Sequence, residues 1–195
     1  LSAALDAFPL DVGGRVAIDM GASTGGFTQV LRERGADPVI AVDVGHDQLS
    51  PRIRDDPGVV AVEGYNVRDM TPESLAAVSG VDIAPTLITG DLSFISLGLV
   101  LPAVRATMSP DADVVLLIKP QFEVGRTSVR GGLVTDPASR ADAVAGVLLS
   151  AWGAGLGTHG VIASPLPGTP RQPEFVWWVA CGGWPGAGGG GGQPR

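Results

Sequence analysis

The chain has 195 residues, of which 45% are hydrophobic and 17% charged, so its composition suits a single packed domain. The net charge of −7 disfavours a chain that grips a nucleic-acid backbone by itself, because that binding needs clustered cations. A single cysteine, Cys181, excludes an internal disulfide, and the first residues lack a signal-peptide pattern, so we expect a cytoplasmic protein. The apolar runs are shorter than the roughly 20 residues of a membrane-spanning helix, which disfavours a membrane protein.

Strands and helices alternate in the first 118 residues of the predicted structure. Continuous apolar runs with polar ends predict strands at residues 15–19, 39–43, 59–63, 86–91 and 113–118. The stretches between them predict helices at residues 27–34, 48–55, 72–78 and 97–108. This alternation predicts an α/β fold with a doubly wound, Rossmann-like sheet.

The pattern changes after Lys119. Residues 121–136 predict a polar loop, and residues 137–155 predict a helix with Asp136 as its N-cap. Strands at residues 160–164 and 174–181 are expected to close a sheet that is mostly parallel, with a C-terminal antiparallel strand. We therefore expect one domain over residues 1–181, followed by a flexible Gly-rich tail over residues 182–195.

The segment between the first predicted strand and helix reads DMGASTGGF, residues 19–27. Its glycines let the backbone approach a ligand closely, and the start of the helix offers free N–H groups. Asp43 ends the second predicted strand, where an acid can bond ribose hydroxyls. The segment lacks Gly-x-Gly-x-x-Gly, which disfavours NAD and FAD. An acid two residues before the first glycine suits a ligand with an amino-acid end, such as S-adenosylmethionine; an ordinary tight turn is the alternative.

Six stretches of the sequence match one family in order. They are LDAF (5–8), DMGASTGGF (19–27), AVDVG (41–45), DLSFISL (91–97), IKPQFE (118–123) and SPLPGTPRQPEF (164–175). On these residues the chain resembles the TlyA-type ribosomal RNA 2′-O-methyltransferases, which carry an FtsJ-like methyltransferase domain and are also labelled hemolysins. The resemblance covers nearly the whole chain except the Gly-rich tail. It implies methyl transfer from S-adenosylmethionine to a ribose 2′-hydroxyl, with cytidine in 16S or 23S ribosomal RNA as the expected target.

The resemblance also implies site residues and a partner. Asp91, Lys119 and Glu174 match the last three members of the family's catalytic Lys-Asp-Lys-Glu set, and no metal is implied. The expected cofactor contacts are Asp19, Gly21, Ala22, Ser23, Thr24, Gly25, Gly26, Phe27, Asp43, Asn66 and Asp91. The family's leading lysine stands just before the stretch that begins here at Leu1. We therefore expect an N-terminally truncated catalytic domain, whose affinity for ribosomal RNA or ribosomal subunits comes largely from a missing S4-like domain.

Chemistry supports an active site at the strand ends, because Asp91 and Lys119 each follow a predicted strand. Methyl transfer needs the hydroxyl oxygen in line with the S–CH₃ bond and its proton removed or shared. A neutral lysine can accept that proton, but nearby carboxylates favour its charged form, and a second lysine would oppose them. We therefore expect the chain that starts at Leu1 to bind the cofactor and to transfer methyl weakly or not at all. Taken singly, Asp91 could be a strand cap and Lys119 a solvated residue.

Several residues and functions stay open from the sequence. Arg126 and Arg130 suit either RNA phosphates or a solvated loop, and the family's usual Gly-Asn before the glutamate is replaced by Arg171-Gln172. Trp177 and Trp178 lie in a predicted strand, which favours core packing over base stacking. One alternative function is a non-catalytic cofactor-binding or hemolysin-type interaction protein. A nicotinamide oxidoreductase is a further alternative, which the glycine segment disfavours.

Overall fold

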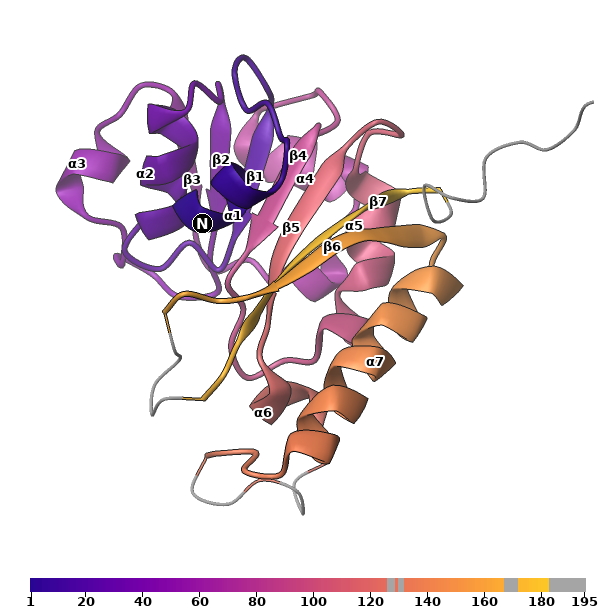
Figure 1. Cartoon of the computed structure of the whole chain (residues 1–195). Coiled ribbons are helices and arrows are strands. Elements are labelled where there is room, and N and C mark those ends of the chain that lie inside the picture. The colour runs from indigo at the N-terminus through magenta and orange to yellow at the C-terminus, as the bar shows by residue number, and fades with distance from the viewer. Residues whose placement is uncertain (126–128, 130–131, 167–171, 183–195) are drawn as a thin grey trace, which may run out of the picture.

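Seven strands form one sheet in the order β3-β2-β1-β4-β5-β7-β6 (Figure 1). The computed structural model describes residues 1–125, 129, 132–166 and 172–182. The strands are β1 (Ala17–Met20), β2 (Val39–Val42), β3 (Val59–Val62), β4 (Leu87–Gly90), β5 (Asp113–Ile118), β6 (Leu156–Ala163) and β7 (Phe175–Cys181). The first five run parallel, and β7 pairs antiparallel with both β5 and β6. The mostly parallel, doubly wound sheet with a reversed C-terminal strand is confirmed.

Helices cover both faces of the sheet. Residues of α1 (Ser2–Ala7), α2 (Gly26–Glu33) and α3 (Pro51–Arg54) pack on one face, against side chains such as Ala17 and Ala41. Residues of α4 (Pro72–Ser79), α5 (Leu101–Thr107) and α7 (Pro137–Gly153) pack on the other, against side chains such as Ile18 and Ile40. Successive strand residues point to opposite faces, so the continuous apolar strands supply both cores.

Short helical turns complete the chain at the strand ends. They are η1 (Val67–Asp69), η2 (Leu97–Leu99) and α6 (Pro120–Glu123). Asp136 accepts hydrogen bonds from the backbone N–H groups of Ala138 and Ser139, which confirms it as the N-cap of α7. Trp177 is fully buried and its Nε1 donates to Thr158 Oγ1 at 3.0 Å, so its expected place in the core is also confirmed.

The structure differs from the predicted elements in several places. The helix expected at residues 48–55 is the four-residue α3, and the turn η1 was not predicted. Helix α1 was not predicted, because its six residues are too few to show a helical period. The helix expected at residues 97–108 is divided into η2 and α5, and Pro102 lies in the first turn of α5. The loop expected from residue 121 starts later, because Pro120 begins the helical turn α6. Strand β6 begins at Leu156 rather than at residue 160 and contains an irregularity between Thr158 and Gly160.

A membrane-spanning helix would need both length and a nearly uncharged apolar surface. None of the helices in the described part of the chain combines the two.

Candidate active site

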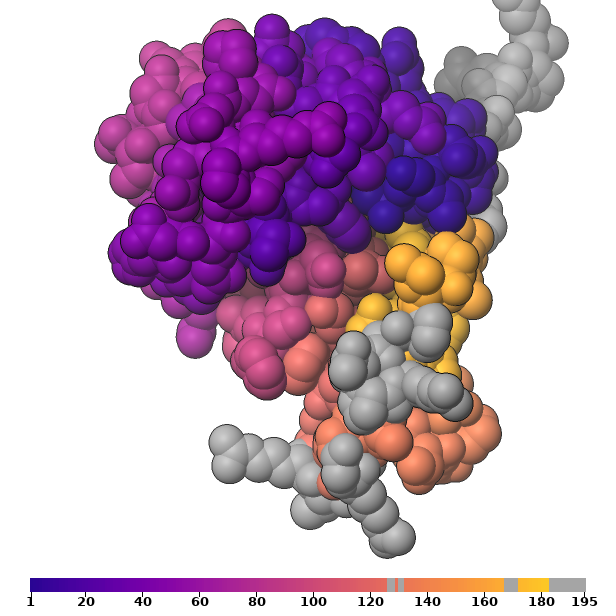
Figure 2. Space-filling view, turned by 90° about the vertical axis from the view of Figure 1, so that its left-hand side faces the viewer, coloured from indigo at the N-terminus to yellow at the C-terminus, as the bar shows by residue number. Residues whose placement is uncertain are grey.

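Four parallel strands are followed by a glycine or a charged residue at one edge of the sheet. Gly21 follows β1, Asp43 follows β2, Asp91 follows β4 and Lys119 follows β5. The chain changes its direction of winding between β1 and β4, and doubly wound sheets bind ligands in the crevice at such a switch point. Figure 2 shows the surface around this edge, where the indigo and purple N-terminal half lies above pink and orange segments from later in the chain.

The turn from β1 to α2 has a shape that needs glycine. Gly21 has φ 74°, and a Cβ atom there would lie 2.9 Å from the backbone oxygen of Asp91. Gly25, the N-cap of α2, has φ 99°, and its Cβ would lie 2.9 Å from Ile53. Between the two glycines, the backbone N–H of Ser23 donates to Asp43 Oδ2 at 2.8 Å. The turn is therefore fixed against the ends of β2 and β4, with its backbone open to a ligand.

A cavity of about 490 Å³ lies beside this turn. Its walls contain five of the expected cofactor residues: Gly21, Ser23, Asp43, Asn66 and Asp91. Its volume is within the range of roughly 300–1,000 Å³ that is typical of small-molecule sites. The cavity thus combines a glycine turn, two carboxylates and an amide at the switch point of the sheet.

The remaining expected cofactor residues do not line that cavity. Phe27 lines a smaller cavity of about 170 Å³, which Asp91 and Glu174 also border. Ala22 is buried against Ala41 and the start of α3. Direct contact with a ligand stays a prediction for all of the expected cofactor residues, both those that line a cavity and those that do not.

Asp19 is fully buried behind the glycine turn. Its Oδ2 accepts a hydrogen bond from Thr28 Oγ1 at 2.7 Å, and its Oδ1 accepts a longer one from Thr89 at 3.4 Å. Burial raises the pKa of Asp19 to about 6, and the hydrogen bonds from Thr28 and Thr89 limit the rise. The carboxyl therefore links the end of β1 to the first turn of α2, and so fixes the two ends of the glycine turn relative to each other.

Lys119 and Asp91 form the central polar contact of the site. Lys119 Nζ lies 2.6 Å from Asp91 Oδ1 and donates to Ser93 Oγ at 3.0 Å. The Lys119 side chain is 13% exposed, whereas that of Asp91 is 40% exposed. The ammonium is thus held from two sides in a partly desolvated position, where its interactions are stronger than in open water.

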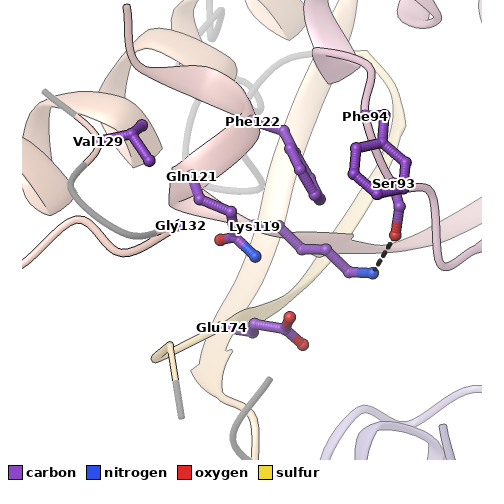
Figure 3. A pocket seen from close by; sticks show the side chains of 8 residues that line it. All are labelled: Ser93, Phe94, Lys119, Gln121, Phe122, Val129, Gly132 and Glu174. Carbon is purple, nitrogen blue, oxygen red and sulfur yellow. Dashed lines mark hydrogen bonds between the residues drawn. The ribbon is translucent and has the colours of Figure 1, made fainter. Parts of the chain in front are cut away.

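Glu174 lies at the same edge of the sheet, just before β7, which is the neighbour of β5 on the side opposite β4. It lines the 170 Å³ cavity with Asp91 and a further cavity of about 410 Å³ with Lys119, and Figure 3 shows its carboxylate facing the lysine. Burial raises the pKa of Glu174 above its usual value; the charge of Lys119 opposes the rise and that of Asp91 adds to it. The structure therefore brings together all three residues that the sequence predicted to be catalytic.

The two most specific sequence stretches are bound to each other. Glu123 of IKPQFE accepts hydrogen bonds from Ser96 Oγ at 2.6 Å and from the backbone N–H of Leu97 at 2.9 Å, both in DLSFISL. Burial raises the pKa of Glu123, and these hydrogen bonds counteract part of that effect. Glu123 therefore fixes the segment after β4 relative to the segment after β5, and with it the spacing of Asp91 and Lys119.

The sequence interpretation missed three residues at the site. Ser93 holds Lys119, while Phe94 and Gln121 line the 410 Å³ cavity. Phe94 has φ 65°, is 92% exposed and lies with its ring centre 5.2 Å from that of Phe122. All of these residues lie inside the DLSFISL and IKPQFE stretches, which was the available signal.

Three of the arginines singled out in the sequence, Arg126, Arg130 and Arg171, lie outside the described residues. Gln172, which stands in the place of the family's usual Asn, is fully buried, and its Oε1 accepts a hydrogen bond from the backbone N–H of Val134 at 2.7 Å. It ties the chain before Glu174 to the segment that leads into α7. Within the described residues, no group of three or more His, Cys, Asp or Glu side chains is arranged to hold a metal ion.

Comparison with known proteins decides what kind of domain this is. Residues 1–180 match the family of FtsJ-like methyltransferases. The chain belongs to this family. It is 49% identical over 180 residues to a 16S/23S rRNA (cytidine-2′-O)-methyltransferase, TlyA, of Mycobacterium tuberculosis, a match that covers 92% of this chain and 65% of the relative. The chain thus spans just under two thirds of the length of that relative.

Further relatives agree with this family assignment. Hemolysin A of Brachyspira hyodysenteriae is 34% identical, over 87% of this chain and 69% of the relative. A solved structure from Streptococcus thermophilus, described as a hemolysin candidate, superposes with a TM-score of 0.88 at 36% identity, over 93% of this chain and 64% of that one. A methyltransferase of Burkholderia thailandensis, solved with S-adenosylhomocysteine, has a TM-score of 0.63 at 17% identity over 93% and 76% of the two chains, which shows the shared fold.

Proposed function

We propose that the protein transfers a methyl group from S-adenosylmethionine to a ribose 2′-hydroxyl of ribosomal RNA, with cytidine in 16S or 23S rRNA as its target. One observation carries the proposal. The Lys119–Asp91 pair, 2.6 Å apart, lies between the 490 Å³ cavity beside the glycine turn and the 410 Å³ cavity that Glu174 lines. A donor in one cavity and an acceptor in the other would meet at this pair. The relative from Mycobacterium tuberculosis carries the name of this activity.

The residues beside the glycine turn fit S-adenosylmethionine. Gly21 keeps the backbone of the turn within reach of a ligand, since a Cβ atom there would meet Asp91. Asp43 is at the end of β2, where its carboxylate can accept hydrogen bonds from ribose hydroxyls. Asn66 lines the same cavity and can contact the adenine. Bound there, the cofactor supplies an electrophilic methyl group on a sulfonium.

The acceptor hydroxyl is oriented by the catalytic residues of this chain. The Lys119 ammonium, held by Asp91 and Ser93, donates a hydrogen bond to the ribose 2′-oxygen and fixes its position. The hydroxyl proton passes to a carboxylate beside the lysine. Glu174 is the candidate acceptor of the proton, because burial raises the pKa of its carboxyl and makes the carboxylate a stronger base.

The RNA partner requires more cationic surface than this chain offers. Its 13 lysine and arginine residues are outnumbered by 20 acidic residues, whereas binding to RNA phosphates depends on clustered cations. We propose that an S4-like domain, which the family resemblance implies, supplies much of the RNA affinity. We propose that the protein acts in the cytoplasm, because ribosomal RNA is its proposed partner.

A paired experiment tests this function. Titration calorimetry with S-adenosylmethionine and with NAD should show binding of the first alone. Labelled methyl transfer to ribosomal subunits from a strain without the gene should then place the label on a 2′-oxygen, at a rate that rises when the chain carries the family's leading lysine and S4-like domain. Binding of S-adenosylmethionine with no transfer in either form would favour the non-catalytic alternative.

A further inference from the structure

The 410 Å³ cavity beside Lys119 has both aromatic and polar side chains in its walls. Two aromatic rings, Phe94 and Phe122, lie on one side of it, and Lys119 and Glu174 lie at the end where the reaction takes place. Figure 3 shows that Gln121 projects into the same space, close to Lys119 and across from Glu174. A ribose whose 2′-hydroxyl meets Lys119 would therefore extend its base toward Gln121.

The amide oxygen of Gln121 lacks a hydrogen-bond donor among the described residues. This oxygen, Oε1, is also buried. A buried amide oxygen without a donor is unfavourable, because it has lost its hydrogen bonds to water and gained none in return. A ligand that enters the cavity with an N–H donor would remove this penalty.

We propose that Oε1 of Gln121 accepts a hydrogen bond from the exocyclic amine of the target base, so that Gln121 selects a base that carries this amine. The inference rests on the proposed function, which places a cytidine in this cavity. The N4 amine is the hydrogen-bond donor of the cytosine base, so it is the group of this base that can donate to Oε1 of Gln121. Uridine has an oxygen acceptor at the same position, which would face the amide oxygen in the orientation that the structure shows.

Three variants separate recognition from folding. Gln121→Met keeps the length of the side chain and removes its hydrogen bonds. Gln121→Glu has an acceptor oxygen in place of both the amide oxygen and the amide nitrogen, so it cannot donate to uridine in either orientation. Gln29→Met is the matched control, because Gln29 lies on α2 and donates to Glu33 at 2.8 Å, outside the cavities.

The test measures methyl transfer to two forms of one ribosomal subunit from a strain without the gene. In one form the target cytidine is kept, and in the other it is changed to uridine. We expect kcat/KM to favour cytidine by about tenfold in the wild type and in Gln29→Met, the size of a good side-chain contact to a base. Gln121→Met should bring the ratio close to one, and Gln121→Glu should keep or increase it. Affinity for S-adenosylmethionine should be unchanged in all variants.

The possible failures are distinguishable. An equal cytidine-to-uridine ratio in the wild type and Gln121→Met, or a lower ratio in Gln121→Glu, overturns the role of Gln121 while methyl transfer itself stands. No transfer to either form of the subunit by the wild type that carries the family's leading lysine and S4-like domain contradicts the proposed function, and the inference with it. If Gln121→Met loses affinity for S-adenosylmethionine, the ratio in Gln121→Glu decides alone.

Discussion

At the scale of single residues, the ammonium of Lys119 joins the two halves of the site. It contacts Asp91 and Ser93, which both follow β4, while its own backbone follows β5. We expect Lys119→Met to lower methyl transfer by roughly 10²- to 10⁴-fold, because it removes the group that orients the hydroxyl. Affinity for S-adenosylmethionine, measured by calorimetry, should change less than about threefold. Ser93→Ala removes only one partner of the lysine and should have a smaller effect; an equal loss in both would argue against direct contact between Lys119 and the substrate.

We expect Glu174 to determine how the rate of methyl transfer falls at acid pH. Burial is the main cause that raises its pKa above the ordinary value of 4.5. A protonated carboxyl cannot accept the hydroxyl proton, so the rate should fall as the pH drops through this raised pKa. We expect the acid limb of kcat to lie above pH 4.5 in the wild type and to be absent in Glu174→Gln, which should retain only a small part of the rate. An acid limb of the same position and depth in both proteins would exclude Glu174 as the proton acceptor.

Asp19 makes stability depend on pH. Its pKa is about 6 in the folded chain and 3.8 as the ordinary value, so the folded state binds the proton more tightly. The free energy of unfolding therefore falls as the pH rises through this window, by about 3 kcal/mol from this group. Asp19→Asn lacks this pH-dependent contribution to the free energy of unfolding, because the amide does not titrate. The difference in unfolding free energy between wild type and variant, measured with urea at pH 4 and pH 7.5, should shift in favour of the variant at the higher pH; a constant difference would contradict this.

At the scale of elements, the β1–α2 turn is the feature that most directly shapes the cofactor site. In Gly21→Ala the new methyl group would meet the backbone of Asp91, at a φ of 74° that L residues rarely adopt. We expect affinity for S-adenosylmethionine to fall by roughly tenfold or more, in addition to a loss of stability of about 1–2 kcal/mol from the backbone strain. Gly14→Ala is a matched control, because φ is 69° and no atom lies within 4 Å of the added Cβ. It should lose stability alone.

The sequence predicted the strands that are continuous apolar runs, and it missed the shortest helices. The five parallel strands are continuous apolar runs, so their places followed from composition and spacing. Helix α1 has only six residues, and α6 has four, of which Pro120 is the first. The early start of β6 was missed because residues 156–159 include Gly157 and His159, which weaken a strand pattern.

At the scale of the whole molecule, the three residues proposed to be catalytic were predictable and their surroundings were not. Asp91, Lys119 and Glu174 followed from strand ends and from the family resemblance. The hydrogen bonds of Glu123 to Ser96 and Leu97 join positions 26 or 27 residues apart, so no local pattern could indicate them. The unpaired oxygen of Gln121 likewise depends on how α6 faces the segment after β4. Tertiary packing of two specific stretches determines these contacts.

The central claim is that this site methylates a ribose 2′-oxygen in ribosomal RNA. Mass spectrometry of 16S and 23S rRNA, from cells with and without the gene, tests it most directly. We predict that at least one 2′-O-methylcytidine disappears in the strain without the gene, and that it returns when the intact gene is supplied but not when the gene encodes Lys119→Met. An unchanged pattern of 2′-O-methylation would contradict the proposed function.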